Sequence, residues 1–345
     1  MRLPFSRAPR RLGGIAAVAV AAAAFLMWLR YAPRRITVTE GKFPEELVYV
    51  RSTDDIVNGG VMFTASKTSA KPIAVLWIHG WGTNFYSPTY VTLGRALAAR
   101  GHTTISGNTR MHDLGNVAGY RDGRRIRGGG YWGIASEEIR DLAAWIAFAE
   151  DRGFKQVVLV GHSAGWAAVR SYQAERQDSR VMGVVLASGA VRAETAPTDP
   201  DQLEEARRLV AAGEGDALIR IPKRSFPSYV SAATFLDTAN SPAESRDFFG
   251  VETQTLNPGV TRIRCPLLAF FGTRGDVGNE EDLELLKSSI QRQGSGPSRV
   301  DTIMIRNADH MYTGEETQVA EMIAEWANTL TQSSSSGNGG VSEKR

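Results

Sequence analysis

A serine between two glycines is the first sign of chemistry in the sequence. Ser163 is the centre of the pattern Gly161-His162-Ser163-Ala164-Gly165, which follows the apolar run 156–160 and precedes a helix-like segment from Trp166 to Gln177. A strand before and a helix after are what a nucleophile elbow requires, in which a sharp turn exposes the serine hydroxyl. The flanking glycines fit a turn that is too tight for side chains. The pattern predicts nucleophilic catalysis if the chain also supplies a base, an acid and an oxyanion hole.

The base can be found by elimination among the five histidines. Where such an elbow carries a catalytic triad, the residues follow in the order serine, acid, histidine, and only His310 comes after Ser163. It follows the strand-like segment 300–305, so its loop would lie over the serine at the carboxyl edge of a parallel sheet. We interpret His162 as the variable residue of the elbow, His79 as a turn residue, and His102 and His112 as surface or loop residues.

The acid should follow the preceding strand, and Asp276 is in that position. It comes after the apolar run 267–271 and a glycine turn, which places it at the same sheet edge as His310. A carboxylate adjacent to a histidine rarely reaches Nδ1 of that same histidine, which disfavours Asp309. The alternatives for the acid are Asp309 and, less favoured, Glu280. Asp282 and Asp301 are interpreted as a helix-start residue and a strand-edge residue.

These residue types predict acyl transfer through a covalent intermediate. His310 would take the proton of Ser163 during attack and return it to the leaving group, while Asp276 holds the tautomer of His310. The developing alkoxide needs backbone N–H donors, for which we expect Ala164 and Trp81, the latter in His79-Gly80-Trp81-Gly82. The Trp81 side chain is also placed to line the acyl pocket. No metal and no organic cofactor are expected.

The elements around these residues predict an α/β fold with a mostly parallel central sheet flanked by helices. Strand-like and helix-like segments alternate along the chain, which favours right-handed crossovers. The strand-like segments after the lead-in are 73–78, 103–105, 156–160, 181–187, 267–271 and 300–305, and the helix-like ones include 88–100, 166–177 and 316–330. Before them, 47–50 and 61–64 predict an antiparallel hairpin with its turn at Asn58-Gly59-Gly60. The stretch 108–131 has no clear period and is interpreted as a loop, either functional or plain surface.

Two segments in the second half of the chain lie outside this alternation. Residues 190–260 are rich in proline and are predicted to form a cap over the site mouth. Residues 332–345 are rich in glycine and serine and are predicted to be a disordered tail. The hydrolase-like domain is then expected over 36–331. Cap aromatics favour either an apolar or aromatic acyl group or plain packing of cap on core; they are Tyr229, Phe235, Phe248 and Phe249.

The N-terminal segment 1–35 contains an uncharged, alanine-rich stretch at 12–29, flanked by arginines. Eighteen residues nearly span a bilayer core of about 30 Å, and no convincing cleavage site follows. We expect a single uncleaved membrane anchor with the catalytic domain in the periplasm or elsewhere outside the cytoplasm. The alternative is secretion after signal cleavage, and Arg10-Arg11 is faintly similar to a twin-arginine signal.

Composition excludes some other classes of protein. The net charge of +3 owes much to arginines in the first 35 residues, so no nucleic-acid partner is expected. The one cysteine, Cys265, excludes an intrachain disulfide and a cysteine-rich metal site. The oligomeric state is not indicated by any pattern.

The ordered set of motifs from His79 to His310, with the elbow and Asp276 between them, resembles the α/β-hydrolase superfamily. More weakly, Arg140-Asp141-Leu142, the stretch 185–188 and the stretch 211–216 are similar to fungal siderophore esterases of the fusarinine C type. That resemblance implies a hydroxamate siderophore ester, or a related natural-product ester, as substrate.

The sequence therefore predicts a serine hydrolase that cleaves a carboxylic ester in a small molecule. An acyltransferase or a thioesterase would use the same triad with another acceptor or substrate. A non-catalytic binding protein of the same fold is the alternative from a different class.

Overall fold

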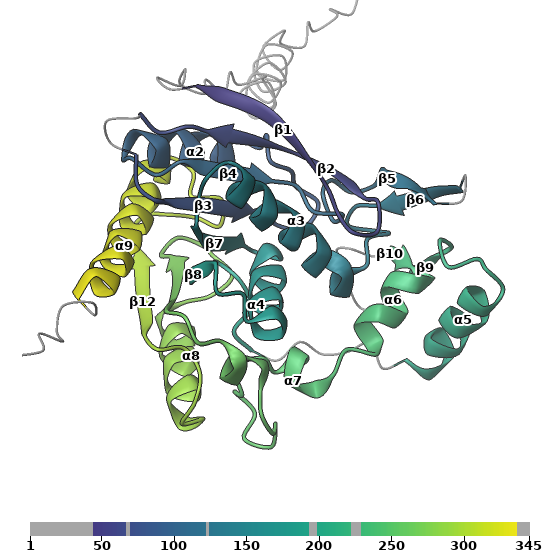
Figure 1. Ribbon diagram of the computed structural model, residues 1–345. Helices are drawn as coiled ribbons and strands as arrows, with labels where there is room; N and C mark the ends of the chain where they lie inside the picture. The colour runs from purple at the N-terminus through teal and green to yellow at the C-terminus, as the bar shows by residue number, and fades with distance from the viewer. Residues whose placement is uncertain (1–43, 67–69, 122–123, 193–198, 222–228, 337–345) are drawn as a thin grey trace, which may run out of the picture. The chain divides into compact units, whose positions relative to one another are not determined.

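Eight strands form one sheet through the middle of the molecule (Figure 1). The computed structural model describes residues 44–66, 70–121, 124–192, 199–221 and 229–336. The described elements belong to one compact unit that begins at Thr39. In spatial order the strands are β1 (Glu45–Arg51), β2 (Val57–Phe63), β4 (Thr104–Gly107), β3 (Ile73–Ile78), β7 (Gln156–His162), β8 (Val181–Ala187), β11 (Leu267–Gly272) and β12 (Val300–Ile305). β2 runs antiparallel to β1 and β4, and all other pairs are parallel, which confirms the predicted mostly parallel sheet.

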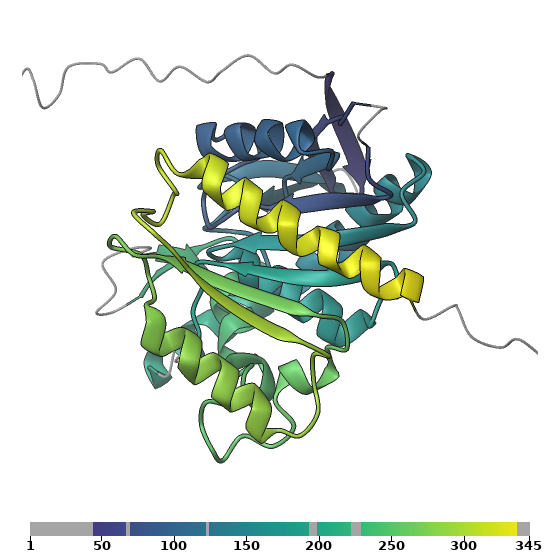
Figure 2. The ribbon, with the colours of Figure 1, turned by 90° about the vertical axis from the view of Figure 1, so that its left-hand side faces the viewer.

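Helices cover both faces of the sheet, and successive residues of a strand pack alternately against one helical layer and the other. Ala74 and Leu76 of β3 pack toward α3 (Glu138–Asp151), α4 (Gly165–Arg176) and α8 (Glu280–Arg292). Val75 and Trp77 pack toward α2 (Pro88–Ala99) and α9 (Glu316–Ser336) on the opposite face. Figure 2 shows α9 crossing that face below α2. Because successive strand residues point to opposite faces, a continuous apolar run supplies two cores at once.

The lead-in hairpin is present, but its predicted turn is wrong. The chain turns at 52–56, where Asp55 has a positive φ of 68° and the Ser52 hydroxyl donates to Asp54. Gly59 and Gly60 lie inside β2. A Cβ at Gly60 would approach the ring of Trp145 to 2.5 Å, so this glycine serves close packing rather than a turn.

The stretch 108–131 is not a plain loop. It contains an antiparallel hairpin of β5 (Asn116–Arg121) and β6 (Arg124–Gly128). The pairing register shifts between Val117 and Gly119, so the period of two is broken within the strand and the sequence shows no alternation.

The predicted boundary of the tail is also wrong. α9 continues to Ser336, so 332–336 are helical rather than disordered. Serine has only a modest helix penalty, and a long helix already packed on the sheet can extend through a few such residues. Residues 337–345 lie outside the described residues.

The insertion between β8 and β11 consists of two parts. Its first part, which we call the cap lobe (200–221 and 229–239), contains α5 (Pro200–Ala211), β9 (Leu218–Arg220), β10 (Tyr229–Ser231) and α6 (Ala232–Ala239) around a small apolar core of its own. The second part contains α7 (Ala243–Arg246) and the 3-10 turn η2 (Gly259–Arg262). It buries Phe248, Phe249 and Val260 in the core of the sheet. Only the first part is therefore a separate lobe.

The aromatic residues of the insertion divide between these two cores. Phe235 is buried in the cap lobe, while Phe249 packs edge-on against Trp166 of α4. Tyr229 is 45% exposed. Packing thus accounts for the three phenylalanines.

The predicted anchor at 12–29 lies outside the described residues. Among the described helices, none is both long enough and apolar enough to cross a bilayer.

Candidate active site

Ser163 lies in the turn between β7 and α4, with a positive φ of 54°. A Cβ at Gly161 would clash with the carbonyl oxygen of Gly165. A Cβ at Gly165 would come within 2.5 Å of the carbonyl oxygen of His79. The two glycines are thus required by close backbone approach, as the sequence pattern predicted. The strained serine conformation is held by the strand and helix on either side.

Ser163, His310 and Asp276 come together from three separate loops at the carboxyl edge of the sheet. Ser163 Oγ lies 3.1 Å from His310 Nε2, and His310 Nδ1 lies 2.8 Å from Asp276 Oδ1. A carboxylate can only accept, so Nδ1 carries the proton and Nε2 is left to accept from the serine hydroxyl. The side chain of His310 is 31% exposed, and that of Asp276 is fully buried.

Besides the histidine, other donors also hold the Asp276 carboxylate. Ser188 Oγ donates to Oδ2 at 2.6 Å, and the backbone N–H of Gly272 donates to the same oxygen at 2.7 Å. Burial alone would raise the pKa of Asp276, but the hydrogen bonds from His310, Gly272 and Ser188 outweigh it and keep the pKa below its usual value. The carboxylate is therefore charged where it faces the histidine.

Sequence reasoning did not find Ser188 or Tyr312. The Tyr312 hydroxyl donates to Ser188 Oγ at 2.8 Å, so it orients the serine toward Asp276. One signal pointed to Ser188: it directly follows β8, the neighbour of β11, and a polar residue at the end of a buried strand lies at the catalytic edge. No comparable signal marks Tyr312.

The expected oxyanion donors lie beside the elbow. Ala164 is the N-cap of α4, and within the described residues its N–H donates to no backbone acceptor. The segment 79–84, which we call the oxyanion loop after the role expected of Trp81, approaches so closely that a Cβ at Gly80 would lie 3.0 Å from Ser163 Cβ. Trp81 follows Gly80 directly, and its indole N–H donates to the carbonyl of Gly130 at 3.1 Å.

The carbonyl group of Gly80 is fixed by several donors. It accepts from His79 Nδ1 at 2.7 Å and from Thr83 Oγ1 at 2.9 Å. His79 Nε2 accepts from the backbone N–H of Thr109, which sets the tautomer. Burial lowers the pKa of His79 to about 4, so it stays neutral. Because the peptide bond is planar and trans, fixing this carbonyl also fixes the opposite direction of the Trp81 N–H.

The remaining histidines and carboxylates occupy other places. His102 lies in the loop before β4, which fits the expectation of a surface or loop residue, and its side chain is buried there; His112 faces Asp113. Asp309 pairs with Arg274, and Glu280 begins α8. Within the described residues, neither carboxylate contacts His310.

A buried polar cluster lies behind the oxyanion loop. Thr109 Oγ1 donates to Glu138 at 2.6 Å, and Arg110 forms ion pairs with Asp54 and Asp141. Burial raises the pKa of Glu138 to about 8, against the opposing effect of the Thr109 hydrogen bond. Near neutral pH, Glu138 is therefore mainly uncharged, and the cluster is closer to electrical balance than its formal charges suggest.

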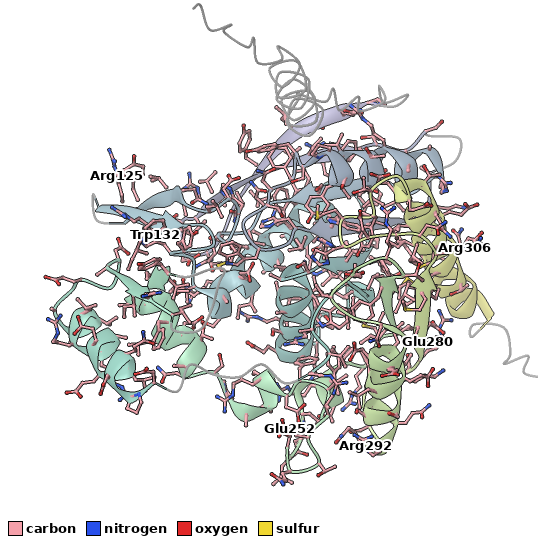
Figure 3. The ribbon with its side chains drawn as sticks, turned by 180° about the vertical axis from the view of Figure 1, so that it is seen from behind. Arg125, Trp132, Glu252, Glu280, Arg292 and Arg306 are labelled. Carbon is pink, nitrogen blue, oxygen red and sulfur yellow. The ribbon has the colours of Figure 1, made fainter. Side chains whose placement is uncertain are left out.

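Aromatic side chains connect the oxyanion loop with the cap lobe. Trp81 and Tyr131 meet edge to face at 5.6 Å between ring centroids, and Tyr131 meets Trp132 in the same way at 5.8 Å. All three rings are partly exposed. Figure 3 shows Trp132 between the β5–β6 hairpin and the cap lobe, where its indole N–H donates to Asp216.

No group of three or more metal-ligating His, Cys, Asp or Glu side chains occurs among the described residues. What the arrangement offers is a serine hydroxyl, an imidazole whose Nε2 faces it, a buried carboxylate and a nearby helix N-terminus.

Comparisons with known proteins agree with this fold. A family model described as the alpha/beta hydrolase family matches residues 75–322, whereas no curated protein matches the sequence. The structure of Est1E from Butyrivibrio proteoclasticus with bound ferulic acid is 13% identical, covers 83% of this chain and 99% of its own, and has a TM-score of 0.58.

Two other esterases show a similar fold. The Pyrococcus furiosus esterase Pf2001 is 14% identical over 86% of this chain and 97% of its own, with a TM-score of 0.52. The esterase domain of a Rhodothermus marinus protein is 16% identical over 83% of this chain and 98% of its own, with a TM-score of 0.51. The family match covers most of the chain and includes the elbow, Asp276 and His310. The chain therefore belongs to the alpha/beta hydrolase family.

Proposed function

We propose that the protein is a serine hydrolase that cleaves a carboxylic ester through an acyl-serine intermediate. One observation carries the proposal: the unbroken hydrogen-bond chain from Ser163 through His310 to Asp276, with the serine on a strained elbow. A serine hydroxyl is a weak nucleophile by itself, and an adjacent base oriented by a third group activates it.

The reaction follows from the positions of the protons. His310 Nε2 takes the proton of Ser163 as the oxygen attacks the ester carbonyl, and Asp276 stabilises the imidazolium that forms. The imidazolium then protonates the leaving alcohol as the acyl-serine forms. A water molecule, deprotonated by the same nitrogen, releases the acid and restores the hydroxyl.

The tetrahedral oxyanion needs donors that are already in place. We propose the backbone N–H groups of Ala164 and Trp81 for this role, since one begins α4 and the other belongs to a peptide held by His79 and Thr83. Loss of one such donor typically raises the barrier by about 3 kcal/mol.

The substrate proposed here carries an aromatic or apolar acyl group. The partly exposed rings of Trp81 and Tyr131 support this proposal, since they lie beside the proposed oxyanion donor. The ferulic acid bound to Est1E is an acid of that kind on a similar fold. A siderophore or other natural-product ester is the narrower candidate that the sequence resemblance implies.

Labelling by a fluorophosphonate tests the activated nucleophile. We expect modification of the purified full chain at Ser163, no modification of Ser163→Ala, and full modification of the control Ser288→Ala, which changes an exposed serine on α8. Absence of labelling in the folded wild-type protein would favour a non-catalytic binding protein.

The substrate is then found with esters and competing acceptors. We expect hydrolysis of p-nitrophenyl esters, with aryl acyl groups preferred over short alkyl ones, followed by a test of siderophore esters. Transfer of the acyl group to an added alcohol or thiol in preference to water would instead identify an acyltransferase, and a preference for thioester substrates would identify a thioesterase.

We also propose that residues 12–29 anchor the protein in a membrane, with the catalytic domain outside the cytoplasm. The uncharged stretch between arginines supports this proposal. Determining the N-terminus of the mature protein distinguishes an intact anchor from the alternative, secretion after signal cleavage.

A further inference from the structure

His162 is a buried histidine that the proposed proton transfers do not use. It precedes Ser163 in the elbow and is 1% exposed. Both of its ring nitrogens have partners: Nδ1 lies 2.8 Å from the Tyr90 hydroxyl, and Nε2 lies 2.8 Å from the carbonyl oxygen of His310. One side chain thus contacts both α2 and the loop that carries the proposed base.

The direction of each hydrogen bond follows from its partners. A carbonyl oxygen can only accept, so His162 Nε2 carries the proton and donates to His310. Nδ1 then accepts from Tyr90, whose oxygen in turn accepts from the backbone N–H of Gly80 at 3.0 Å. Burial raises the pKa of Tyr90, which keeps this donor protonated. With these proton positions, every polar group in the hydrogen-bond series from Gly80 through Tyr90 and His162 to His310 has a partner.

We propose that His162 is a positioning residue that keeps the base His310 and the oxyanion loop in register with Ser163. The inference rests on the proposed function and extends it to a residue outside the triad. Its backbone is continuous with the nucleophile, its Nε2–H holds the main chain of the base, and Tyr90 connects it to Gly80. Ser163, His310 and the oxyanion loop come from separate parts of the chain, so one buried side chain that is hydrogen-bonded between them fixes their spacing.

The electrostatic environment keeps the His162 side chain uncharged, as this positioning role requires. Burial, together with the nearby His310, lowers the pKa of His162 to about 3. The two rings are 4.9 Å apart between centroids. A cation at His162 would repel the imidazolium that forms on His310 during attack. A neutral imidazole donates on one side and accepts on the other without that cost.

Four variants of the full chain test the proposal. His162→Leu removes both hydrogen bonds while leaving an apolar side chain, and His162→Gln retains a donor toward His310. Tyr90→Phe removes only the hydroxyl. The matched control is Tyr172→Phe on α4, which loses a comparable bond to Asp178.

We expect kcat of His162→Leu to fall by on the order of 100-fold with KM little changed, because a displacement of about 1 Å among reacting groups has that effect. His162→Gln should regain about tenfold of the loss through its retained hydrogen bond. Tyr90→Phe should lose about tenfold alone and little more in combination with His162→Leu, because both act through one chain. Tyr172→Phe should keep the wild-type kcat.

Proton NMR separates this proposal from the proposed function. The strongly deshielded proton between His310 Nδ1 and Asp276 should be sharp in the wild type and in Tyr172→Phe, and weakened or shifted in His162→Leu, whether or not turnover occurs. A sharp wild-type signal without fluorophosphonate labelling would contradict the serine hydrolase but leave the positioning role standing.

Three results would overturn the positioning role. The first is a folded His162→Leu with wild-type kcat and an unchanged NMR signal. The second is His162→Gln as impaired as His162→Leu, and the third is full additivity with Tyr90→Phe. If His162→Leu does not fold, wild-type kcat in Tyr90→Phe overturns the proposal instead.

Discussion

At the catalytic edge of the sheet, polar contacts are dense and redundant: Asp276 accepts from His310, Ser188 and Gly272. In the cap lobe, a small apolar cluster around Phe235 provides the core, and a few hydrogen bonds connect it to 131–137, including Ser231 N–H to the carbonyl of Tyr131. The two regions are therefore stabilised by different kinds of contact. At the edge, several hydrogen bonds hold one carboxylate, whereas the cap lobe depends mainly on its own apolar cluster, so we expect changes in that cluster to leave Ser163, His310 and Asp276 in place.

The largest effect should come from breaking the catalytic edge itself. Ser163→Ala and His310→Ala should each lower kcat by about a million-fold, and the double variant should be no worse, because triad residues act as a unit. Steady-state hydrolysis of a p-nitrophenyl ester measures all three. Multiplied losses in the double variant would mean that the two residues do not act together.

Changing the cap lobe should have a different outcome. Phe235→Ala leaves a cavity in the small cluster and should cost about 3–5 kcal/mol of local stability. We expect faster amide hydrogen exchange in α5 and α6, with β7 and β8 unchanged and fluorophosphonate labelling retained. Exchange that increases equally in the sheet would show that the two regions unfold as one. Phe248→Ala, in the sheet core, is the matched comparison.

Most of the catalytic edge could be predicted from the sequence because each element has a local signal. The elbow needs its glycines, and buried parallel strands appear as continuous apolar runs. Asp276 and His310 follow such runs directly. Their spacing along the chain therefore predicts an edge at which the structure brings them together.

The cap lobe and the supporting contacts could not be predicted in the same way. Phe235 and Phe249 look alike in the sequence but lie in two different cores, since only the path of the chain decides which surface each one meets. The hydrogen bonds Tyr90–His162, His162–His310 and Tyr312–Ser188 each join residues more than seventy positions apart, so no local period marks these contacts. The β5–β6 hairpin was missed because a bulge interrupts its alternation.

Glu138 lies where the two regions meet and should make stability depend on pH. Its pKa in the folded protein, about 8, is raised above the usual value near 4.3, so the folded state retains this proton more strongly. Its contribution is fully present at low pH and is lost as the pH rises through about 8. Glu138→Gln should therefore flatten the decline in the free energy of unfolding between about pH 5 and about pH 9, as measured by urea titration. The exposed Glu284→Gln should leave the decline unchanged; an equal slope in both variants would contradict the assignment to Glu138.

The smallest effect should come from removing one of the redundant contacts at the catalytic edge. In Ser188→Ala, Asp276 loses one donor but keeps His310 and Gly272, while the buried Tyr312 hydroxyl loses its acceptor, so stability near neutral pH should fall by about 1–3 kcal/mol. The pKa of folded Asp276 is lowered, so its contribution is present above the unfolded value near 3.9 and is lost as the pH falls through the folded value. Loss of the Ser188 hydroxyl raises that folded pKa toward the usual one, and acid unfolding should begin at a higher pH than in the wild type. Circular dichroism during acid titration measures this shift, with Ser288→Ala as the control. An unchanged acid transition would mean that the remaining donors hold Asp276 by themselves, and the redundancy of the edge would be greater than its hydrogen bonds suggest.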